Sequence, residues 1–261
     1  MTTATDATPW VQAARASHDR LAAIVAGLDA AQLRQQSYDT EWTIADVLSH
    51  LGSGAEIFTL VIDAAVTGGD PPSPDDFKPI WETWNARSPE EQAALSVTAN
   101  ENLITQVESL TPAQRAAFQV TMFGPQPMDL AGVLGMRLSE HALHTWDIAV
   151  ALDPAARVAP DAVDLLVDIL PVFASFAARK APAPVVAAVT ASAPERRFTL
   201  DTGTGDAVSL RPADPDDTAT ASLTLPAEAF LRLVYGRLDD DAELELSGLT
   251  LNELKSVFPG F

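Results

Sequence analysis

The sequence predicts an α+β protein with two domains, a bundle of four long helices followed by a smaller domain of short strands and helices. Two observations favour this fold class. Apolar residues recur at helical spacing through four long segments of the first 155 residues. After Ala181-Pro182-Ala183-Pro184 the apolar spacing falls toward two, which is typical of strands. We therefore expect one domain over residues 1–155 and a second over residues 156–261.

The four long helices are delimited by caps and breakers. The second begins at Thr43, which can form a capping box with Asp46 three residues later. Glycines and prolines in the segment from Thr67 to Pro79 predict a loop, and Phe123-Gly124-Pro125 predicts a turn. The expected helices cover Pro9 to Leu28, Thr43 to about Val66, Pro89 or Glu90 to about Leu110, and Met128 to Leu152.

The second domain should open with a helix from Asp161 to about Arg179 and continue with short strands separated by Gly, Pro and Asp turns. The expected strands are Val185 to Thr190, Arg197 to Asp201, Ala207 to Arg211, Thr220 to Leu225 and Glu243 to Leu246. Helices are expected at Pro226 to Tyr235 and Leu249 to Val257. This alternation predicts a small α+β domain.

Composition narrows the function classes. With 16 Lys and Arg against 36 Asp and Glu, the formal charge of −20 repels phosphate backbones, so nucleic acid is not an expected partner. The chain has no cysteine, which excludes disulfides, thiolate ligands and a cysteine nucleophile, and any thiol chemistry needs a thiol from outside. The N-terminal residues do not resemble a secretory signal, and no uncharged apolar run approaches roughly 18 residues. We expect a cytoplasmic protein with no membrane partner.

One set of residues carries the chemistry that the sequence predicts. Glu140 and His144 are four apart on the expected fourth helix, so both project from one face and can reach one ion. His141 is turned about 100° away from Glu140. His50, in an otherwise apolar run of the second helix, is the natural third ligand. Two imidazoles and one carboxylate leave an open position on a zinc-like ion.

Each of these residues also has a structural interpretation. Inward histidines are more often hydrogen-bonded core residues than ligands, so a metal-free bundle in which His50 and His144 only hydrogen-bond stays open. Asp147 could accept the ring N–H of a ligand histidine without touching the metal itself, or it could cap or pair at the surface. Trp42 and Trp146 are expected to fill helix interfaces instead of forming a substrate platform.

Two segments carry a resemblance to a known family. Residues 41–51 (EWTIADVLSHL) and 140–148 (EHALHTWDI) resemble the signature segments of the mycothiol-dependent maleylpyruvate isomerase family, within the DinB-like metal-binding superfamily. Residues 223–237 (LTLPAEAFLRLVYGR) and 258–261 (FPGF) resemble its small C-terminal domain. The resemblance implies a DinB-like four-helix bundle followed by a sterol-carrier-like α+β domain.

The resemblance also implies a site and an activity. The family's metal triad falls on His50, Glu140 and His144, and an arginine thought to face the metal cleft falls on Arg237, with Arg232 in reach of the same alignment. The implied cofactors are a divalent metal, zinc first with nickel, manganese and iron still open, and mycothiol as the thiol cosubstrate.

We expect a thiol S-transferase that activates mycothiol for attack on a small electrophile. Two alternatives remain: a mycothiol-dependent maleylpyruvate isomerase, and a metal-binding module without catalysis. We expect a monomer or a weak homo-oligomer.

Overall fold

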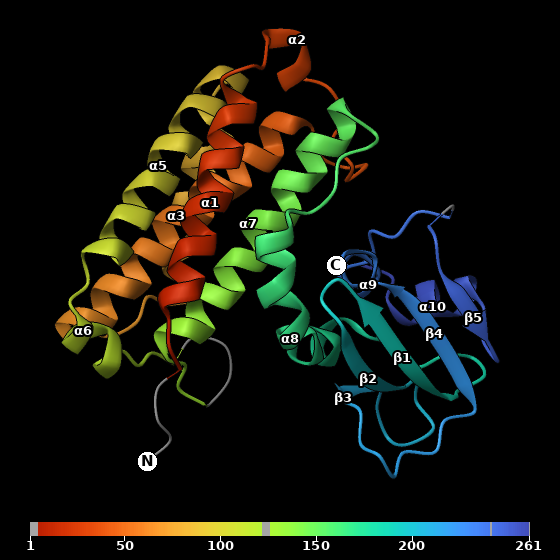
Figure 1. Ribbon diagram of the computed structural model, residues 1–261. Coiled ribbons are helices and arrows are strands. Elements are labelled where there is room, and N and C mark those ends of the chain that lie inside the picture. The colour runs from red at the N-terminus through yellow and green to blue at the C-terminus, as the bar shows by residue number, and fades with distance from the viewer. Residues whose placement is uncertain (1–4, 122–125, 241, 261) are drawn as a thin grey trace. The chain divides into compact units, whose positions relative to one another are not determined.

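The computed structural model describes residues 5–121, 126–240 and 242–260. It divides into two compact units, Met1–Ala162 and Val163–Phe261, so the division falls within the first turn of helix α8, Pro160–Ala177. The helical first unit and the sheet-containing second unit confirm the α+β class that the sequence predicts (Figure 1). The turn expected at Phe123-Gly124-Pro125 lies outside the described residues.

Four long helices form the bundle of the first unit, as predicted. Helix α3 packs along α5, and α1 packs against both α5 and α7, so the apolar stripes of all four meet in one interior (Figure 1). The helices are α1 (Thr8–Val25), α3 (Ile44–Thr67), α5 (Pro89–Ser109) and α7 (Leu130–Leu152).

The start of α3 is set by the capping box that the sequence predicts. The hydroxyl of Thr43 accepts a hydrogen bond from the backbone N–H of Asp46, and the carboxylate of Asp46 accepts one from the backbone N–H of Thr43 at 2.9 Å. Two N–H groups that the helix leaves unpaired are thereby satisfied. This start determines which face of α3 each later side chain occupies, including His50.

Three short helices were not expected: α2 (Ala30–Leu33), α4 (Pro74–Asn85) and α6 (Pro112–Ala117). The loop predicted from Thr67 to Pro79 is wrong in its second half, because α4 begins at Pro74. Proline suits the first helical position, where its missing N–H would have no partner. The preceding Ser73 donates its backbone N–H to the Asp76 carboxylate at 2.8 Å, which stabilises the helix start.

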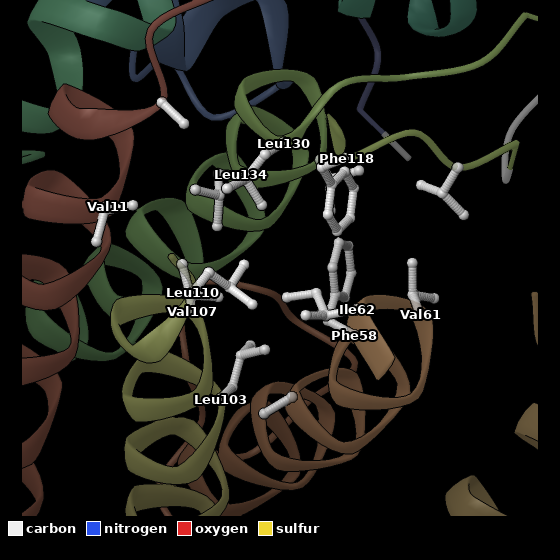
Figure 2. Close-up of a cluster of buried hydrophobic side chains, with 14 of the residues drawn as sticks. Val11, Phe58, Val61, Ile62, Leu103, Val107, Leu110, Phe118, Leu130 and Leu134 are labelled. Atoms are coloured by element: carbon white, nitrogen blue, oxygen red, sulfur yellow. The ribbon is translucent and has the colours of Figure 1, made fainter. Parts of the chain in front are cut away.

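The bundle core consists of two groups of buried apolar side chains. Figure 2 shows one of them, in which Phe58 and Ile62 of α3 meet Leu103 of α5 and Leu134 of α7. The second surrounds Leu48 of α3. Helix α3 is apolar and long enough to cross a membrane by length and composition alone, but 67% of its most apolar window is buried inside the unit, as expected for a core helix.

The second unit contains one mixed sheet with helices α8, α9 and α10. Strand order is β3-β2-β1-β4-β5; β1 and β4 run parallel, and the other neighbouring pairs run antiparallel. Helix α9 follows β4 directly and packs on β1 and β4. The elements are β1 (Val186–Ser192), β2 (Arg196–Asp201), β3 (Ser209–Pro212), β4 (Ala221–Pro226), α9 (Ala227–Val234), β5 (Glu245–Ser247) and α10 (Leu251–Val257).

The packing of α4 on α3 depends on Gly52. A Cβ atom at Gly52 would lie 2.1 Å from the ring of Trp84, which is fully buried. We predict that Gly52→Ala lowers the free energy of unfolding by about 1–3 kcal/mol in urea denaturation, because the ring must move. Gly132→Ala is the control, since its Cβ would meet nothing closer than 3.4 Å. Equal stability of both variants would contradict this account.

Candidate metal centre

The bundle brings His50, Glu140 and His144 together. His50 comes from α3, while Glu140 and His144 lie one turn apart on α7. The Nε2 atom of His50 lies 3.1 Å from Oε2 of Glu140, and Nε2 of His144 lies 3.6 Å from the same oxygen. One donor atom from each residue falls within 4.8 Å of the other two. Both imidazoles therefore turn their Nε2 atoms toward a single carboxylate oxygen.

Asp147 orients one of these imidazoles. Its side chain is fully buried, and its Oδ2 lies 2.8 Å from Nδ1 of His144. A carboxylate at this distance holds a ring proton on Nδ1 and fixes the ring with Nε2 turned toward Glu140, so Nε2 is the ring atom that a cation would bind. Asp147 is buried and not at the surface, and its position behind the ring of His144 is compatible with the role of an outer carboxylate, which stays a prediction.

His141 lies apart from the three. It is buried on a different face of α7, and its Nδ1 is 2.8 Å from the hydroxyl of Ser17 on α1. The two histidines of α7 therefore contact different residues. His141 is a useful control for substitutions of His50 and His144.

Burial and hydrogen bonding shift the pKa values of Glu140 and His144 in opposite directions. Burial lowers the pKa of His50. Burial would raise the pKa of Glu140, but hydrogen bonds with His144 and His50 outweigh it and leave this pKa far below its usual range. Burial would lower the pKa of His144, but hydrogen bonds with Asp147 and Glu140 outweigh it and raise this pKa. The carboxylate is thus ionised near neutral pH, and a cation and a proton compete for His144.

The two tryptophans near the centre differ in environment. Trp42 is half-buried, and its ring centroid lies 5.1 Å from that of His50 and 5.8 Å from that of His144, so it forms one wall of the centre. Trp146 is 2% exposed and donates its indole N–H to the carbonyl of Ala156. The expectation of a core side chain is confirmed for Trp146, whereas Trp42 packs on core residues and on both imidazoles.

The two candidate arginines lie in the second unit and also differ. Arg232 of α9 is buried and donates to the carboxylates of Glu228 and Asp239 at 2.9 and 3.0 Å. Arg237 is half-buried and donates to the carbonyl of Tyr235 at 3.0 Å. Two carboxylates hold Arg232, so a substrate anion would compete with them there; the role of Arg237 stays a prediction.

Sequence reasoning missed Arg137, which is 3% exposed in the bundle interior. The sequence does indicate an unusual position, because Arg137 is the one charged residue in the apolar run 130–138 (LAGVLGMRL) of α7. A lone arginine in such a run must be buried or disrupt the packing.

The hydrogen bond between Asp147 and His144 yields a pH prediction. Metal affinity of the protein should fall as pH drops through the raised pKa of His144, because a proton then occupies the ligand. Asp147→Asn removes the carboxylate, so this fall should move to lower pH, and affinity at pH 8 should drop about 10- to 100-fold. Calorimetric titration with Zn²⁺ at several pH values measures both. Asp153→Asn, at the end of the same helix, is the control, and an unchanged pH dependence in Asp147→Asn would contradict the assignment.

Comparisons with known proteins identify the two domains of the chain. The model of the mycothiol maleylpyruvate isomerase N-terminal domain matches residues 14–149, and that of the MDMPI C-terminal domain matches residues 157–250. No match is found among curated proteins.

Two crystal structures share the fold, one of the mycothiol-dependent maleylpyruvate isomerase and one of its histidine-to-alanine mutant. Each has a TM-score of 0.71 at 16% identity and covers 97% of this chain and 98% of its own. The matched family models are those of an isomerase, in agreement with the expectation that the chain is an enzyme. From its two matched domains, the chain belongs to the mycothiol maleylpyruvate isomerase family.

Proposed function

We propose that the chain binds one divalent metal ion through His50, Glu140 and His144 and uses it to activate a mycothiol-type thiol for attack on a small electrophile. The observation that carries this proposal is the convergence of both Nε2 atoms on one oxygen of Glu140, with Asp147 behind His144. Nitrogen and oxygen donors in this number suit zinc first.

The residues present fit such an ion. A bound divalent ion supplies an open coordination position at which a thiol loses its proton near neutral pH. Glu140 contributes one negative charge. Asp147 fixes the ring of His144 with Nε2 turned toward Glu140, and the ring of Trp42 packs beside both imidazoles. Since the chain has no cysteine, the thiol must come from a second molecule.

Two fates of the thiol adduct distinguish the candidate reactions. In isomerisation, the thiolate adds to a carbon of a C=C bond, the resulting single bond rotates, and elimination expels the thiolate and restores the double bond. The family and the shared fold favour this reaction. In S-transfer, the new C–S bond persists as a thioether. At 16% identity to the isomerase, the residues that select its substrate do not carry over, so S-transfer remains the second candidate.

Arg237 is proposed to bind a carboxylate of the electrophile through a bidentate ion pair. Arg237→Ala should reduce kcat/KM by about 10- to 1,000-fold while the metal content stays unchanged, because this side chain lies outside the triad. Steady-state kinetics and elemental analysis measure the two effects. Arg197→Ala, in the same unit with a 71% exposed side chain, is the control. A variant of Arg237 as active as this control would rule out the role.

We further propose a cytoplasmic protein that acts as a monomer or weak homo-oligomer on small molecules. Its net charge of −20 disfavours phosphate backbones. A small-molecule thiol and a small electrophile are sufficient partners for the proposed reaction.

The first test of the proposal is elemental analysis of the purified protein and of three histidine variants. His50→Ala and His144→Ala should lose the bound metal, because each removes one of three ligands, whereas His141→Ala should retain it. Equal loss in all three would contradict the ligand assignment. An absence of metal uptake by the unmodified protein would support a structural role of these histidines.

A cobalt-substituted sample then separates an enzyme from a module without catalysis. Addition of mycothiol should produce a thiolate-to-cobalt absorption band, and turnover of maleylpyruvate without net thiol consumption would identify isomerisation. Stoichiometric consumption of thiol with an electrophile would identify S-transfer. A metal-loaded protein whose spectrum no thiol perturbs would contradict the proposed activity.

A further inference from the structure

Arg137 is a buried cation whose hydrogen-bond partners are neutral. It lies on α7 one turn before Glu140, and its Nη2 donates to the backbone carbonyl of Leu51 at 2.9 Å and to Oδ1 of Asn100 on α5. Leu51 directly follows His50 in α3. Within the described part of the chain, no carboxylate lies at ion-pair distance from this guanidinium.

The fold makes room for the guanidinium beside the metal centre. A Cβ atom at Gly54 of α3 would lie 3.0 Å from Nη1 of Arg137, so a larger residue at Gly54 would crowd the guanidinium. The guanidinium therefore lies where α3, α5 and α7 meet, adjoining the helical turns that carry His50 and Glu140.

The charge of Arg137 persists at neutral pH and acts on the centre. Burial lowers the pKa of Arg137 to about 10, which still leaves it protonated. The charge of Arg137 contributes to lowering the pKa of His50, and the carboxylate of Glu140 favours the protonated form of Arg137. The positive charge is therefore coupled to two of the three proposed ligands.

A buried cation without a paired anion lowers the stability of the fold, and a single substitution could supply the anion. An aspartate at position 100 would have nearly the shape of Asn100 and would pair with the guanidinium. The neutral amide instead satisfies the hydrogen bond and leaves the charge in place. The amide nitrogen of Asn100 also donates to the carbonyls of Ser96 at 2.8 Å and Leu51 at 3.4 Å, hydrogen bonds that an aspartate could not make.

We propose that Arg137 is a positioning residue whose uncompensated charge makes the open coordination position of the metal favour anionic ligands, such as a thiolate or a carboxylate. The inference rests on the proposed metal centre. The same charge opposes binding of the metal cation, so anion affinity and metal affinity change in opposite directions when it is neutralised. Two unit charges on the order of 10 Å apart in a partly dehydrated site correspond to about a tenfold change in affinity.

Asn100→Asp tests the proposal without removing Arg137. Co²⁺ affinity, followed by the visible spectrum, should increase about tenfold, and azide affinity of the cobalt-loaded protein should decrease about tenfold. Asn100→Leu is the uncharged control, because it removes the hydrogen bonds that Nδ2 of Asn100 donates, as Asn100→Asp does, and also removes the acceptor of Arg137, but adds no charge. Both affinities of this control should stay within about threefold of the unmodified protein.

Variants of Arg137 complete the test. Arg137→Lys should preserve the anion affinity, and Arg137→Met, if it folds by circular dichroism, should resemble Asn100→Asp. Unchanged affinities in Asn100→Asp, or a parallel loss of both affinities, would overturn the inference and leave the metal centre intact. A failure of the unmodified protein to bind Co²⁺ would instead overturn the proposed metal centre, and this inference with it.

Discussion

The contact between His50 of α3 and Glu140 of α7 is the constraint on which the centre depends. The two residues are separated by 90 positions in the chain, and they meet only if both helices have the correct rotation and height. Thr43 sets the start of α3, and Asp129 sets that of α7 by accepting the N–H of Gly132. The apolar stripes of the bundle then bring the two helices together.

The electrostatics of the centre oppose those of the whole chain. The protein carries a formal charge of −20, yet Arg137 is buried one turn before Glu140 and donates to the neutral oxygens of Leu51 and Asn100. The charge of Arg137 offsets part of the negative charge of the carboxylates at the centre and thereby favours small anions there, while the acidic remainder of the chain repels polyanions. A protein with a large negative net charge can thus still favour small anionic reactants, if a positive charge lies close to its binding site.

Much of the fold and the three clustered residues could be predicted from the sequence, because their signals are local. Apolar spacing indicates helices, and a Glu and a His four apart share a face of any helix. Helix α4 was missed because its prolines resemble loop residues until Ser73 is seen to pair with Asp76. The environment of Arg137 could not be predicted, since its partners Leu51 and Asn100 come from two other helices.

X-ray absorption spectroscopy of the zinc-loaded protein, before and after addition of mycothiol, tests the central claim most directly. Without thiol, the account predicts only nitrogen and oxygen neighbours at about 2.0–2.2 Å from zinc, including two imidazoles. With thiol, one sulfur neighbour should appear at about 2.3 Å. A spectrum that mycothiol leaves unchanged, or one without imidazole neighbours, would contradict a thiol-activating centre built on His50, Glu140 and His144.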